Sequence, residues 1–101
     1  MDMKNFLKIN RISKLEKNKV LENETIFLNQ RYIRNIVIND EMINIVYTMS
    51  NSDLSTTVYK ISVDNGEYLE LRETINKISL IRCYVTQKEY EEILRQLNYW
   101  E

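Results

Sequence analysis

Basic side chains recur at short spacing within residues 4–19, where Glu16 is the lone acidic residue. Lys and Arg neutralise the phosphates of nucleic acids, so a dense set of them indicates an electrostatic footprint for duplex DNA. Arg31 and Arg34 extend this set along the chain. We therefore expect DNA contacts from Lys4, Lys8, Arg11, Lys14, Lys17, Lys19, Arg31 and Arg34.

The charge of the chain is divided unevenly between its two parts. Residues 1–34 hold eight Lys and Arg against four Asp and Glu, a net charge of +4, and the remainder holds six against eleven, a net charge of −5. Such an asymmetry favours an acidic partner for the basic part. The competing interpretation is a solvated helix face, because runs of charge usually lie in solvent.

Most catalytic chemistry is excluded by composition. The chain has no His, one Cys and one Gly, which excludes Ser-His and Cys-His pairs, CxxC zinc sites and glycine-rich phosphate loops. An acidic cluster at Asp64, Glu67 and Glu70 with Arg72 leaves a metal-dependent nuclease open, but a polar hairpin is the favoured interpretation. We expect a non-enzymatic DNA-binding accessory or regulatory protein with no cofactor and no metal.

The aromatic residues offer an alternative function. Tyr99 and Trp100 close the sequence, and exposed aromatic side chains concentrate binding energy at protein interfaces. The alternative is therefore an inhibitor or adaptor that binds a protein partner through this aromatic end. A stacking platform for nucleic-acid bases is less favoured than packing in a core for Tyr32, Tyr47, Tyr59 and Tyr68.

Length and composition indicate one globular domain. The 101 residues are 44% hydrophobic and 29% charged, values typical of folded proteins. No apolar run is long enough for a membrane span, no signal-peptide pattern is present, and Cys83 has no disulfide partner, so we expect a cytoplasmic protein. The absence of Ala and Pro beside 13 Ile and 12 Asn reflects AT-rich codons, as in some bacteria and their plasmids and phages.

The clearest predicted element is a C-terminal helix. Thr86 and Glu89 form a Thr-x-x-Glu capping box, in which each side chain can satisfy a backbone N–H. An apolar stripe at helical spacing follows the box. The stripe consists of Tyr90, Ile93, Leu94 and Leu97.

Two hairpins are predicted upstream of this helix. In the first, Ile36 and Ile38 pair with Ile45 and Ile43 across a turn at residues 40–41. In the second, a three-residue loop at residues 64–66 places Ile61 opposite Leu69 and Lys60 opposite Glu70. The alternative for the second is a helix over residues 67–78. Residues 25–28 and 80–85 are further predicted strands.

The N-terminal segment is the most ambiguous. Phe6, Ile9, Ile12 and Leu15 form a loose apolar stripe, which favours a basic helix; alternatively, Ser13 and Glu16 cap a helix that follows a short strand. The whole chain, residues 1–101, then forms an α+β domain: an antiparallel meander of about four to six strands with helices at both ends. A winged-helix arrangement is the alternative. The sequence does not decide whether the protein is a homodimer.

Overall fold

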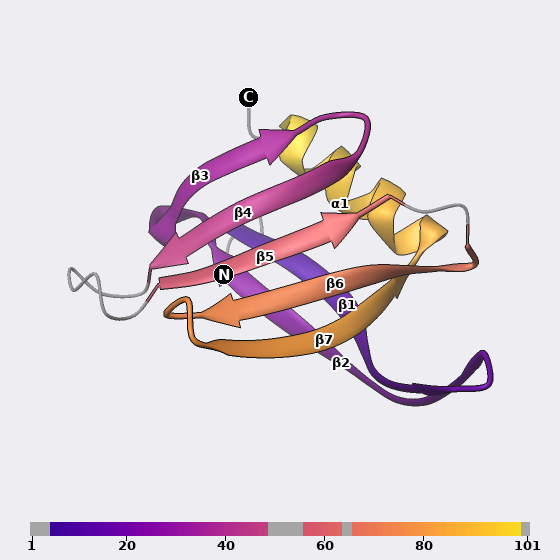
Figure 1. Ribbon diagram of the computed structural model, residues 1–101. Coiled ribbons are helices and arrows are strands. Elements are labelled where there is room, and N and C mark those ends of the chain that lie inside the picture. The colour runs from indigo at the N-terminus through magenta and orange to yellow at the C-terminus, as the bar shows by residue number, and fades with distance from the viewer. Residues whose placement is uncertain (1–4, 49–55, 64–65, 100–101) are drawn as a thin grey trace.

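The protein is a strongly curved antiparallel sheet with one helix packed against it (Figure 1). The computed structural model describes residues 5–48, 56–63 and 66–99. In these ranges the chain forms seven strands in the order β2-β1-β7-β6-β5-β4-β3. The elements are β1 (Phe6–Glu16), β2 (Lys19–Asn29), a short 3-10 helix η2 (Gln30–Tyr32), β3 (Ile33–Ile38), β4 (Met42–Thr48), β5 (Thr56–Ser62), β6 (Tyr68–Ile75), β7 (Ser79–Thr86) and α1 (Gln87–Tyr99).

The predicted N-terminal helix is wrong, because this segment is the long hairpin of β1 and β2. Its buried residues Leu7 and Ile9 are two apart, which is the period of a strand. The turn uses Lys17 and Asn18 with φ of 50° and 61°, as the two-residue turns that match strand twist require. The alternative helix capped by Ser13 is wrong too, since Ser13 and Glu16 lie within β1.

The predicted strand number is also too low. The chain continues as strand β6 to Ile75 where a helix over residues 67–78 was the alternative. It then reverses at Asn76 and Lys77, again with positive φ of 53° and 63°. With one α-helix in the described residues, at the C-terminal end of the fold, the winged-helix alternative is wrong as well.

Of the two predicted hairpins, one is confirmed in register. Ile36 lies opposite Ile45, and Ile38 lies opposite Ile43. In the second hairpin the faces are as predicted but the register is shifted by two residues. Lys60 pairs with Arg72, so the predicted pair with Glu70 is wrong. The predicted turn residues 64–65 lie outside the described residues.

The C-terminal helix is confirmed together with its apolar stripe. Ile93 and Leu97 are buried, and Tyr90 and Leu94 pack against the core. One half of the predicted capping box is present, because the Glu89 backbone N–H donates to Thr86 Oγ1 at 3.1 Å, whereas the Glu89 carboxylate accepts from Asn10 of β1. Figure 1 shows α1 behind the strands of the sheet, with the β1–β2 hairpin running beneath them and projecting beyond.

The core lies on the concave face of the sheet, where alternate residues of the strands point inward. Strands β1 and β7 share one register pair, Ile12 with Tyr84, and diverge on either side of it. The helix packs against the core on the side where these two strands have diverged. The helix thus covers an opening in the sheet. The buried core comprises Leu7, Ile9, Leu28, Ile43, Ile45, Tyr47, Tyr59, Ile61, Leu69, Leu71, Cys83, Val85, Ile93 and Leu97.

Candidate nucleic-acid interface

The β1–β2 register places acidic residues opposite the basic ones that the sequence singles out. Arg11 lies opposite Glu24, Lys14 opposite Glu22, and Lys19 opposite Glu16. Opposite charges at facing positions of a strand pair attract each other and neutralise the local field. The N-terminal hairpin is therefore less cationic than the spacing of its lysines along the chain indicates.

Arg11 serves the fold itself. Its guanidinium forms an ion pair with Glu73, and the two side chains are 14% and 11% exposed. Its Nε also donates to Glu24 at 2.7 Å. Burial lowers the pKa of Arg11, but the hydrogen bond to Glu24 and the charge of Glu73 outweigh burial, so the pKa is raised. Arg11 is thus held between two carboxylates and is not available to a phosphate.

The remaining predicted contacts are scattered over the molecule. Lys8 is exposed on β1, Arg31 lies in η2, and Arg34 lies in the edge strand β3. Lys17 and Lys19 flank the β1–β2 turn, which is anchored where Tyr68 Oη donates to the Asn18 carbonyl at 3.3 Å. Lys4 and Trp100 lie outside the described residues, as does the side chain of Tyr99.

A more compact cationic group lies on the outer face of the sheet. Lys60 of β5 faces Arg72 of β6, and Arg72 faces Arg82 of β7. Lys60 and Arg72 each lie between two buried residues, and Arg82 precedes the buried Cys83, so all three point away from the core. We call Lys60, Arg72 and Arg82 the cationic row. At about 4.8 Å per strand spacing, it spans about 10 Å.

Like charges at facing positions destabilise a sheet, and the row is compensated in part. Glu70 forms an ion pair with Arg72 and another with Arg82, whose Nε lies 3.1 Å from the carboxylate. Among the described residues Lys60 makes no ion pair. Three cations against one carboxylate leave a net positive face that suits an anionic ligand.

Sequence reasoning missed this row because its members are far apart in the chain. Lys60, Arg72 and Arg82 come from three strands, and the predicted pairing of Lys60 with Glu70 gave a neutral pair. The signal that finds them is the position of each cation next to a buried apolar residue, namely Ile61, Leu71 and Cys83, combined with the correct register.

The four tyrosines for which core packing was favoured over a stacking platform divide between core and surface. Tyr47 and Tyr59 are buried with an edge-to-face contact at 6.4 Å between ring centroids, and Tyr32 packs on Tyr47 at 6.2 Å. Burial, and then the charge of Glu73, raise the pKa of Tyr59 to about 12. Burial likewise raises the pKa of the Cys83 thiol. These groups belong to the core, whereas Tyr68 is partly exposed.

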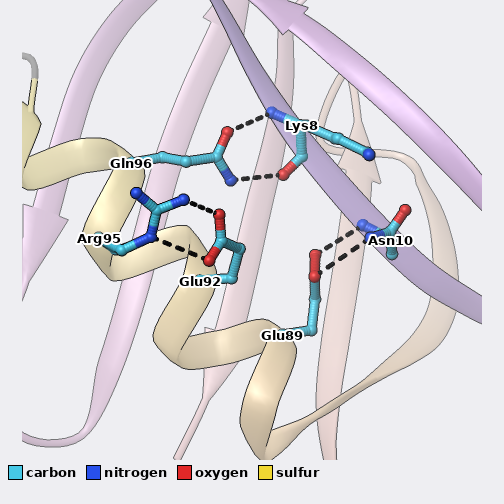
Figure 2. A network of polar contacts seen from close by, with 6 residues as sticks. All are labelled: Lys8, Asn10, Glu89, Glu92, Arg95 and Gln96. Carbon is cyan, nitrogen blue, oxygen red and sulfur yellow. Dashed lines mark hydrogen bonds and ion pairs between the residues drawn. The ribbon is translucent and has the colours of Figure 1, made fainter.

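A second concave region lies between α1 and the β1–β2 hairpin. This groove has a volume of about 810 Å³ and a polar lining that includes Lys8, Asn10 and Glu89. Figure 2 shows three pairs among its polar groups: Gln96 with the Lys8 backbone, Glu89 with Asn10, and Glu92 with Arg95. The Glu89 carboxylate accepts from the backbone N–H of Asn10 at 2.8 Å, and Glu92 forms an ion pair with Arg95. The hydrogen bond from Arg95 lowers the pKa of Glu92.

The structure also bears on metals and membranes. In the described ranges no group of three Cys, Asp or Glu residues gathers as a metal site, and Glu70 of the predicted acidic cluster is engaged by Arg72 and Arg82. Within the same ranges no helix has the length and apolar character that crossing a membrane requires.

Comparison with known proteins adds no relative: the chain matches no protein-family model, and no significant similarity to a curated protein or to a solved structure was found.

Proposed function

We propose that the protein is a non-enzymatic nucleic-acid-binding accessory protein of the cytoplasm. The observation that carries the proposal is the cationic row, which sets three positive side chains side by side on one sheet face. Phosphate contacts supply most of the affinity of sequence-independent binding to nucleic acids. The row supports this function better than the N-terminal hairpin, whose cations face carboxylates.

The three cations of the row lie on paired strands, which suits a binding surface. Each of the three residues lies within a hydrogen-bonded strand, and both neighbours of Lys60, Tyr59 and Ile61, are buried. Because folding has already ordered the backbone that carries these cations, binding of a ligand does not carry that entropy cost.

The test is fluorescence anisotropy with a labelled duplex of about 30 base pairs at two salt concentrations. For the natural protein we expect binding that weakens as salt rises. Changing Lys60→Gln, Arg72→Gln and Arg82→Gln together removes three phosphate contacts. For this triple variant, the slope of log affinity against log salt concentration should be shallower by about 2.7, at about 0.9 per phosphate contact.

A matched variant removes the same charge from the surface that the sequence indicated. Lys8→Gln, Lys14→Gln and Arg34→Gln together change three exposed cations outside the row. This variant should keep most of the affinity and slope. The reverse ranking of the two variants would place the interface on the N-terminal part of the chain. Absence of binding by the natural protein at low salt, both to the duplex and to single strands of equal length, would reject the function itself.

A further inference from the structure

Two tyrosines lie on the sheet without serving the core. Tyr32, Tyr47, Tyr59 and Tyr90 all belong to the core or pack against it. Tyr68 and Tyr84 are partly exposed and do not. They share the outer face with the cationic row, because Tyr68 lies an even number of residues from Arg72, as Tyr84 does from Arg82.

The register places these rings in line between two groups of cations. Tyr84 is two residues from Arg82, about 7 Å along the strand, and lies opposite Glu70. Tyr68 lies opposite Thr86, one step further from the row. Beyond it, Tyr68 Oη contacts Asn18.

The far end of this path carries Lys17 and Lys19, which flank Asn18 in the chain, and Glu16 lies opposite Lys19 there. The order across the face is the cationic row, then Tyr84, then Tyr68, then the β1–β2 turn. Glu70, the acidic residue along the path, already forms ion pairs with Arg72 and Arg82. Its charge is thereby offset within the protein.

Aromatic rings beside a row of cations match the chemistry of an unpaired polynucleotide. Cations hold its phosphates, and each unpaired base can stack on a ring, whereas a duplex keeps its base faces stacked inside the helix. Resting on the proposed function, we infer that the outer face of β6 and β7 selects single-stranded nucleic acid, with Tyr84 as the principal stacking residue.

The test is anisotropy at one salt concentration with a labelled oligothymidylate, an oligouridylate of equal length, and a duplex. The natural protein should bind a single strand at least about tenfold more tightly than the duplex, as expected for one or two stacked bases. The relative affinities for the oligothymidylate and the oligouridylate show whether the protein prefers single-stranded DNA or RNA. Tyr84→Leu should lower single-strand affinity at least about fivefold and leave duplex affinity unchanged.

Two further variants separate stacking from folding. Tyr84→Phe keeps the ring and should keep the affinity. Phe27→Leu removes another exposed ring, 47% exposed on β2, and should also leave affinity unchanged. Thermal melting verifies that Tyr84→Leu is folded at the assay temperature.

The possible failures are distinct. Equal affinity for duplex and single strand, or a Tyr84→Leu protein that binds as the natural one does, overturns the stacking inference and leaves the nucleic-acid function standing. The same holds if Tyr84→Phe binds as weakly as Tyr84→Leu, since the ring is then not the determinant. No binding to any of the three probes overturns both.

Discussion

The side-chain amide of Gln96 on α1 makes both hydrogen bonds of a strand neighbour to the backbone of Lys8 on β1. Its Oε1 accepts from the Lys8 N–H at 2.9 Å, and its Nε2 donates to the Lys8 carbonyl at 2.8 Å (Figure 2). Two helical turns earlier in α1, the Glu89 carboxylate accepts a hydrogen bond from the backbone N–H of Asn10. The helix thus satisfies strand β1 where β7 has diverged from it, and backbone groups left without a partner are costly.

We therefore predict that Gln96→Leu lowers the free energy of unfolding by about 1–3 kcal/mol, because it removes two hydrogen bonds to β1. Urea denaturation measures this change. Gln96→Glu is the matched control, since its carboxylate can accept from the Lys8 N–H but cannot donate to the carbonyl, and it should lie between the two. A Gln96→Leu protein as stable as the natural one would mean that water replaces the amide without loss.

The ion pair of Arg11 and Glu73 gives a second prediction. Glu73→Gln leaves the guanidinium, 14% exposed, with Glu24 as its remaining carboxylate. Removing one member of a buried pair costs on the order of 3 kcal/mol, and Glu24 should reduce this cost. Urea denaturation should show the loss. Replacing both members, with Arg11→Met and Glu73→Leu, should recover part of it, because no buried charge then lacks a partner.

This pair also separates a structural role of Arg11 from a role in binding. Arg11→Met should destabilise the fold while the folded protein keeps its affinity for nucleic acid. If Arg11→Met is as stable as the natural protein but binds more weakly, the assignment of Arg11 to the fold is contradicted.

The pKa of Tyr59, raised to about 12 from its ordinary 10, predicts alkaline destabilisation. Because the folded protein favours the neutral phenol, its contribution is complete below pH 10 and is lost as the pH rises towards 12. A shift of this size corresponds to roughly 2–3 kcal/mol. The unfolding free energy of the natural protein should fall across this window more steeply than that of Tyr59→Phe. Parallel curves for the two proteins would contradict the shift.

How much of the fold the sequence predicts depends on the range of the interactions. Helix α1 follows from contacts three and four residues apart and from the Thr86 cap, so it is confirmed. The pairing of Ile36 with Ile45 is also local and confirmed. The β1–β2 hairpin was not predicted, because the spacing of its apolar residues also fits a helix loosely and its turn contains no glycine that would indicate a turn.

The candidate interface was harder to predict for the same reason. A run of lysines is visible in the sequence. The acidic residues that face these lysines, such as Glu22 opposite Lys14, are identified only when the register of β1 and β2 is known. The cationic row depends on the β5–β6 register. The predicted register differs from the observed one by two residues, so every side chain lies on the correct face, but Lys60 was paired with Glu70 in place of Arg72.

The second unmarked turn supports a final prediction. Asn76 and Lys77 both have positive φ, a conformation that costs a residue with a Cβ about 1–2 kcal/mol, whereas glycine adopts it freely. Lys77→Gly should therefore raise the free energy of unfolding by about 0.5–1 kcal/mol, allowing for the greater entropy of glycine in the unfolded chain.

The melting temperature of Lys77→Gly should rise by a few degrees, about 4–8 °C per kcal/mol for a domain of this size. Lys77→Ala removes the same charge but keeps a Cβ, so it should bring no gain. Equal melting temperatures for the Gly and Ala variants would show that the left-handed turn stores no strain at Lys77.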